Sequence, residues 1–116
     1  SLHGDKLKTA RRLFTKKIIT SLPDVIITSN DLIAQGIISA AHENGINIPN
    51  DMQITGFDDL LSSAYFIPSV TTVSQNIDEL AKRCFSMLMD LINKKSSVSS
   101  IIEQNIIARN SAKINI

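Results

Sequence analysis

The sequence predicts an α/β fold built around a short parallel β-sheet. The chain has 116 residues, 43% of them hydrophobic and 20% charged, which is the balance of one small globular domain. Short β-branched runs at residues 25–28 and 52–57 flank a helical pattern at residues 31–44. The connection between the two runs is long enough for a parallel crossover, so residues 24–57 are expected to form a strand–helix–strand unit.

A helix is expected ahead of this unit, over residues 5–20, because apolar residues form one stripe and basic residues occupy the rest. Pro23 ends this helix, since proline cannot continue one. The run Val25–Thr28 is apolar on both faces, which is typical of a buried parallel strand. Asn30 and Asp31 are both good helix caps, and we expect Asp31 to cap the helix that follows.

The helix of residues 31–44 is apolar on nearly all its sides and ends at Asn44-Gly45. One face of this helix must lie on the sheet. We expect the other face to meet a partner, either another subunit or a missing part of the chain.

The C-terminal half is expected to contain five further segments. They are an irregular stretch at 58–69, a β segment at 70–73, a helix at 77–93, a polar turn at 94–100 and a last strand at 101–108. Asn76 and Glu79 predict a capping-box-like start for the helix. Its eight apolar positions would contribute roughly 10–20 kcal/mol if fully buried, so they cannot stay exposed in a stable monomer. Cys84, the single cysteine, is expected to be a small buried residue of this stripe.

Charge and composition exclude several classes of function. Twelve basic residues oppose eleven acidic ones, and this near-neutral balance argues against a segment that wraps nucleic acid. Residues 18–81 hold no Lys or Arg, so they suit a neutral, hydroxyl-rich ligand better than a phosphate. No apolar run approaches the roughly 18–20 residues of a membrane span, and no signal peptide is present, so we expect no membrane contact and a cytoplasmic location. The start at Ser1 indicates a piece of something longer.

Polar residues follow the predicted strands where a ligand would bind. In doubly wound sheets, ligands lie beyond the carboxyl ends of the parallel strands. The first strand delivers Asn30 there and the second delivers Phe57 and Asp58. If the strands are neighbours, Asn30 and Asp58 face one crevice, and Gln75 joins them after the third β segment. Their amide and carboxylate groups would clamp sugar or nucleoside hydroxyls, with Phe57 or Tyr65 as a flat apolar wall.

These residues also have plain structural interpretations. Asn30 or Asp31 caps a helix, and Asp58-Asp59 could be a turn that satisfies its own backbone. The two adjacent side chains diverge if the backbone is extended, so they do not make an acid/base pair. No nucleophile elbow, P-loop or dinucleotide fingerprint is present. We therefore expect no catalytic residues, no metal site and no cofactor.

Three motifs, in order and at matching spacing, carry a family resemblance. They are Ser29-Asn30-Asp31-Leu32-Ile33-Ala34-Gln35-Gly36, then Gly56-Phe57-Asp58-Asp59, then Pro68 to Gln75 with Val70 where the family has Leu. Together they resemble the C-terminal part of the effector-binding core of the LacI/GalR (lactose/galactose repressor) family, over about residues 4–112. The resemblance implies part of a type I periplasmic-binding-protein-like fold, mainly its C-terminal lobe. Residues 4–75 would belong to that lobe, and residues 76–116 would form a crossover helix and a returning strand.

The resemblance also implies roles for individual residues. Asn30, Asp58 and Gln75 match positions that hydrogen-bond an effector, and Phe57 matches an aromatic position beside them. The helix of residues 31–44 and the segment Leu60–Ile67 match the dimer interface. The contact residues implied there are Gln35, Ile38, Tyr65 and Phe66.

The implied function is sensing of a sugar or a related small-molecule effector, together with dimerisation, in a DNA-binding transcriptional regulator of the repressor type. DNA would be bound only by an N-terminal headpiece that this chain lacks. The alternative is a transport-type sugar-binding protein of the same fold. An enzyme on this scaffold would need a second catalytic group near Asp58. We expect this chain alone to bind sugar weakly or not at all, and to self-associate, by exchanging the helix of residues 77–93 or by packing the helices of residues 31–44 together.

Overall fold

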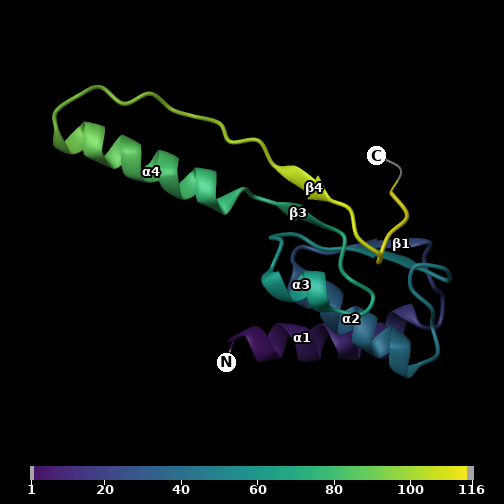
Figure 1. The fold of residues 1–116 in the computed structure, drawn as a ribbon. Coiled ribbons are helices and arrows are strands. Elements are labelled where there is room, and N and C mark those ends of the chain that lie inside the picture. The colour runs from purple at the N-terminus through teal and green to yellow at the C-terminus, as the bar shows by residue number, and fades with distance from the viewer. Residues whose placement is uncertain (1, 115–116) are drawn as a thin grey trace.

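A computed structural model describes the backbone of residues 2–114 and the side chains from residue 5 onward. Figure 1 shows a body (residues 2–76 and 105–114) from which an arm (residues 77–104) projects, giving overall extents of 59 × 36 × 23 Å. The elements in order are α1 (Leu2–Leu13), a π-helical turn η1 (Phe14–Ile18), β1 (Val25–Ile27), α2 (Asp31–Glu43), β2 (Gln53–Thr55), α3 (Leu61–Tyr65), β3 (Thr72–Ser74), α4 (Ile77–Ile92) and β4 (Asn105–Ile107).

The predicted parallel strand–helix–strand unit is confirmed. Strand β1 pairs in parallel with β2, with Ile26 opposite Ile54, and α2 forms the crossover. A parallel bridge between Thr55 and Thr71 continues the pairing toward β3. Strand β3 then pairs antiparallel with β4, which returns from the far end of the arm. The carboxyl ends of β1 and β2 therefore lie side by side at one edge of the body.

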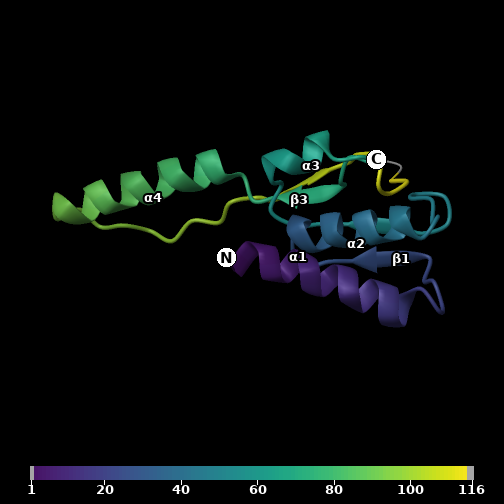
Figure 2. The same cartoon turned by 90° about the horizontal axis from the view of Figure 1, so that it is seen from below.

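Helices α1 and α2 lie against each other, and α2 is covered by this chain on both of its sides (Figure 2). A Cβ atom added at Gly36 would come within 2.9 Å of the Leu7 carbonyl oxygen, so the glycine permits this close approach. Most of α2 is therefore covered within this chain, whereas the sequence predicts that another subunit or a missing part of the chain covers the second face. Beyond α1, the chain continues through η1, where the fully buried Phe14 packs into the same core.

Strand β1 is buried on only one face, which corrects the prediction of a strand buried on both. Side chains alternate along a strand, so Ile26 packs against the core while its neighbours face away. Ile27 is 80% exposed and Val25 is 48% exposed. On this second face, within residues 2–114, the Lys113 amide contacts the Gln53 side chain, while Ile27 stays largely uncovered.

Helix α4 contains no buried residue, although its apolar repeat is as clear as the one in α2. Cys84, expected to be buried, is exposed on this helix. Asn76 precedes α4 in the left-handed conformation, with φ 53°, and its side chain makes no cap hydrogen bond. The predicted capping box is therefore absent, because an N-cap side chain reaches the first turn only from an extended backbone. No helix in the described part of the chain is long and apolar enough to cross a membrane.

Candidate functional site

Backbone hydrogen bonds join the segments that follow β1 and β2, where the candidate ligand-binding residues lie. The Thr28 amide donates to the Thr55 carbonyl at 3.0 Å, and the Asp31 amide donates to the Phe57 carbonyl at 2.9 Å. Asn30 and Phe57 therefore follow adjacent strands at one edge of the sheet, as the sequence predicts.

Asp58 and Gln75 are in direct contact at this edge. The Gln75 Nε2 donates to Asp58 Oδ1 at 2.6 Å, and the Asp58 amide donates to the Val73 carbonyl at 3.0 Å. The turn is tight, because Asp58 has φ 98° and Asp59 has φ 52°, both in the left-handed region. Holding two aspartates in this region costs free energy, which the contacts to β3 must offset. Such held strain is common at functional sites.

Asp59 points to a different partner from Asp58. Its Oδ1 accepts from Arg109 Nη2 at 2.7 Å, and Arg109 Nη1 also donates to the Val70 carbonyl at 3.0 Å. The two aspartates do not form an acid/base pair, although the cause is a left-handed turn and not an extended strand. Sequence reasoning missed Arg109, whose signal was a lone cation just after the last β run.

Asn30 is the cap of α2, which corrects the expectation that Asp31 has this role. Asn30 Oδ1 accepts from the Ile33 amide at 3.0 Å. The amide nitrogen of Asn30 remains the group able to face a ligand. Asp31 is fully buried and takes part in a separate set of hydrogen bonds with Ser63 and Thr72.

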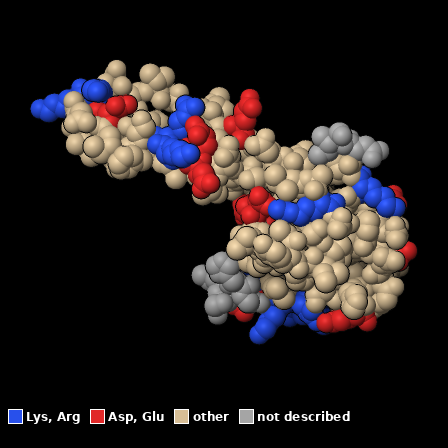
Figure 3. Space-filling model, in the orientation of Figure 1, with Lys and Arg blue, Asp and Glu red and all other residues tan. Residues whose placement is uncertain are grey.

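The site is rich in acceptors and in neutral donors. Asp58 supplies a carboxylate, Gln75 and Asn30 supply amides, and the nearby Arg109 cation is already paired with Asp59. Figure 3 shows that the face of the body over α2 and α3 is almost uncharged, with acidic and basic residues at its rim. This chemistry fits a neutral ligand that carries several hydroxyl or N–H groups. Among the described residues, no cluster of His, Cys, Asp and Glu could hold a metal ion.

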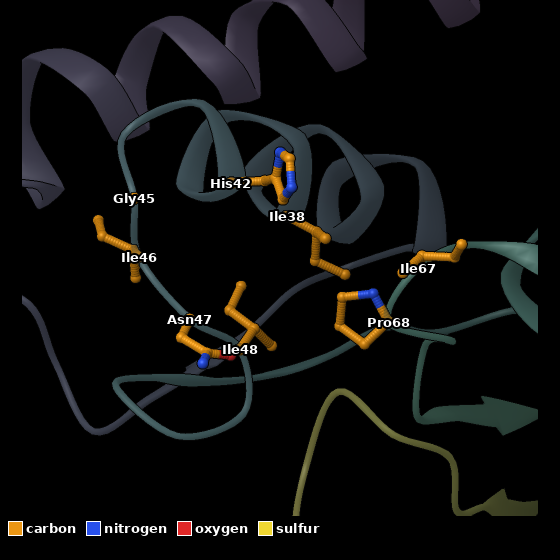
Figure 4. A pocket seen from close by; sticks show the side chains of 8 residues that line it. All are labelled: Ile38, His42, Gly45, Ile46, Asn47, Ile48, Ile67 and Pro68. Carbon is orange, nitrogen blue, oxygen red and sulfur yellow. The ribbon is translucent and has the colours of Figure 1, made fainter.

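A hollow lies elsewhere in the body, at the C-terminal end of α2 (Figure 4). Its volume is about 460 Å³, and eight residues line it: Ile38, His42, Gly45, Ile46, Asn47, Ile48, Ile67 and Pro68. Ile38 and His42, which line it, lie eight and twelve residues beyond Asn30, about 12 and 18 Å along the axis of α2. Its walls are mostly apolar and no set of polar groups converges in it, so the strand ends remain the better candidate for a small polar ligand.

The four residues predicted to make dimer contacts differ in exposure. Gln35 and Ile38 are buried within this chain, where they lie beneath the uncharged face and do not form its surface. Tyr65 is 79% exposed on α3, and the half-buried Phe66 lines a second hollow beside Ile38. Tyr65 and Phe66 are therefore the members of this group that can meet another surface directly.

In comparisons with known proteins, one family model covers both the body and the arm. Residues 3–112 match the family model described as a periplasmic binding protein-like domain. The HTH-type transcriptional repressor PurR of Pasteurella multocida is 35% identical over 95 residues, which are 80% of this chain and 28% of the relative. The chain therefore spans about a quarter of the length of the curated relatives it matches.

Solved structures give the same result for the fold. The periplasmic binding ribose operon repressor protein of Lactobacillus acidophilus is 31% identical, with a TM-score of 0.81 over 93% of this chain and 40% of that one. A LacI family transcriptional regulator from Enterococcus faecium with bound ribose is 25% identical, with a TM-score of 0.82 over 91% of this chain and 40% of that one. These similarities confirm the predicted partial periplasmic-binding-protein-like fold.

Proposed function

The chain belongs to the periplasmic binding protein-like domain family, in the form found in LacI/GalR-type regulators, and we propose that it is the effector-sensing part of such a regulator. The effector is a neutral, hydroxyl-rich molecule such as a sugar or nucleoside. Its binding would alter how the regulator holds DNA, through a segment outside this chain. The transport-type alternative is less well supported, because the relatives compared are named as repressors and transcription regulators.

One observation carries this proposal: Gln75 Nε2 donates to Asp58 Oδ1 at 2.6 Å. This contact lies at the carboxyl end of the parallel sheet, where Asn30 and Phe57 also lie. The Asp58 carboxylate has further lone pairs free to accept hydroxyl protons, and the Gln75 carbonyl oxygen can accept another. Phe57, half-buried beside them, offers the apolar edge that a sugar ring or base would cover. One relative of known structure holds ribose, which makes ribose the first probe to use.

We also propose that the uncharged face bearing Tyr65 and Phe66 is where two copies of the regulator meet. Tyr65 and Ile67 are highly exposed there, and an apolar hollow lies next to them. Surfaces of this kind, rich in aromatic side chains and poor in charge, are typical of the centres of protein interfaces. Gln35 and Ile38 would hold this face in shape from below.

A thermal-shift screen of the intact regulator tests the proposed function. Ribose, other sugars and nucleosides are added in turn, and a ligand at a hundred times its Kd should stabilise the folded state by about 2.7 kcal/mol. Gln75→Ala should abolish the shift, whereas Gln53→Ala, at the opposite end of β2, should preserve it. A panel without any shift, or a shift that survives Gln75→Ala, would contradict the proposal.

A further inference from the structure

A buried carboxylate, that of Asp31, lies between helix α3 and the turn of residues 57–59, called here the effector turn. Asp31 has no exposed surface, and both of its oxygens accept hydrogen bonds. Its Oδ1 accepts from Thr72 Oγ1 at 2.6 Å. Its Oδ2 accepts from Ser63 Oγ at 2.6 Å and from the Leu60 amide at 2.7 Å. A buried charge is stable only when it is fully hydrogen-bonded, so these donors cannot move independently of the carboxylate.

Helix α3 depends on this carboxylate for its first turn. The helix has five residues, and the side chain of Leu60, at its N-cap, makes no capping hydrogen bond. Asp31, on another element, accepts from the Leu60 amide itself, as the N3 side chain of a capping box does. So short a helix is not stable by itself, because its nucleation is unfavourable. The orientation of α3 is therefore set from outside, by Asp31 and by the Gln35 amide, which donates to the Ser63 hydroxyl at 3.1 Å.

The effector turn is tied to the same carboxylate from the other side. The Thr72 hydroxyl that donates to Asp31 also accepts from the Asp59 amide at 3.3 Å. The backbone just before this turn also packs tightly against Asp31. A Cβ atom added at Gly56 would lie 2.0 Å from Asp31 Oδ1. A displacement of residues 57–59 must therefore move Thr72, the carboxylate or both.

We propose that Asp31 is a positioning residue that couples the effector turn of residues 57–59 to helix α3. This inference rests on the proposed function for its biological meaning, since the turn carries Asp58 and α3 carries Tyr65. A ligand that pulls Asp58 or Gln75 shifts the Thr72 hydroxyl, and the carboxylate passes the shift to the Leu60 amide and the Ser63 hydroxyl. Linkage makes this coupling reciprocal. If effector binding changes the free energy of a contact at α3, that contact changes the free energy of effector binding by the same amount.

Hydrogen–deuterium exchange with mass spectrometry on the full chain tests this coupling without any effector or DNA. Thr72→Val removes the hydroxyl and should speed exchange at least about tenfold in two peptides, residues 57–59 and residues 60–66. Thr72→Ser keeps the hydroxyl and should restore slow exchange in both. Thr71→Val is the matched control for the α3 peptide, because Thr71 is equally buried but its hydroxyl bonds to the Arg109 backbone and not to Asp31.

A second pair of variants tests the coupling in the reverse direction. Ser63→Ala should speed exchange at residues 57–59 as well as in α3, whereas Ser62→Ala, which removes only a contact to Gln35, should leave residues 57–59 unchanged. If Thr72→Val loosens α3 no more than Thr71→Val does, or if Ser63→Ala stays confined to α3, the coupling is wrong. Failure of the regulator to respond to any effector would overturn the proposed function and leave this result standing.

Discussion

Helices α2 and α4 carry the same kind of apolar repeat and end in opposite environments. In α2, eight of 13 residues are buried, between α1 and the sheet. In α4, none of 16 residues is buried. The repeat therefore encodes the need for a covering surface and not the surface itself. The body supplies that surface within residues 2–76, whereas the arm leaves its own apolar stripe uncovered by any described part of this chain.

Two phenylalanine substitutions, one in the body and one on α4, compare how much each apolar surface contributes to stability. Phe14 has no exposed surface and lies in the body's core, so Phe14→Ala should lower the free energy of unfolding by about 3–5 kcal/mol. Phe85 is 66% exposed on α4 within one chain, so Phe85→Ala should change it by less than about 0.5 kcal/mol at concentrations where the chain is monomeric. Urea unfolding followed by circular dichroism gives both values. A large loss from Phe85→Ala would show that another copy of the chain covers the arm.

The ion pair in the body should contribute more to stability than the ion pair on the arm. Arg109 and Asp59 are mostly shielded, and Arg109 also holds the Val70 carbonyl, so Arg109→Ala should cost about 1–3 kcal/mol. Arg83 and Glu79 form an exposed pair one turn apart on α4, so Arg83→Ala should cost no more than about 0.5 kcal/mol. Unfolding at low and high salt checks the comparison. Equal costs for the two arginines would contradict it.

Two asparagines that precede helices give the smallest contrast. Asn30 caps α2 with its side chain, so Asn30→Ala should cost about 1 kcal/mol and Asn30→Ser should restore most of it. Asn76 precedes α4 with a left-handed backbone and no cap bond, so Asn76→Gly should be tolerated. Asn76→Ser should cost about 1 kcal/mol, because serine tolerates that conformation less well. Thermal unfolding of the four variants measures these differences, and a reversal of the serine results would contradict the assignment.

Local patterns in the sequence were enough to predict the parallel unit. Short β-branched runs predicted β1 and β2, and the crossover length predicted their parallel pairing. The carboxyl ends of the predicted strands put Asp58 and Gln75 at one edge, where Gln75 Nε2 and Asp58 Oδ1 are 2.6 Å apart. What the sequence did not reveal depends on partners far along the chain. Asp31 can be buried because Ser63 and Thr72, more than 30 residues away, donate hydrogen bonds to it. The exposure of β1 and α4 depends on whether distant segments pack against them, which their own sequences do not specify.

The cap assignment shows why such local choices are hard to make. Asn30 and Asp31 are adjacent and both can cap a helix. The choice is made by Gly56, whose missing side chain opens the space that the Asp31 carboxylate occupies. No pattern within α2 contains that information.

The proposal that this chain senses an effector is tested most directly by Asp58→Ala in the intact regulator. The compound giving the largest shift in the thermal screen, with ribose tested first, is added to the regulator–operator complex, and operator affinity is measured with and without it. We predict that Asp58→Ala weakens the ligand response by at least about tenfold, the loss expected for hydrogen bonds to a charged group, while operator affinity without ligand is unchanged. Asp24→Ala, at the opposite end of β1, should respond like the unmodified protein. An unaltered response in Asp58→Ala would contradict the account.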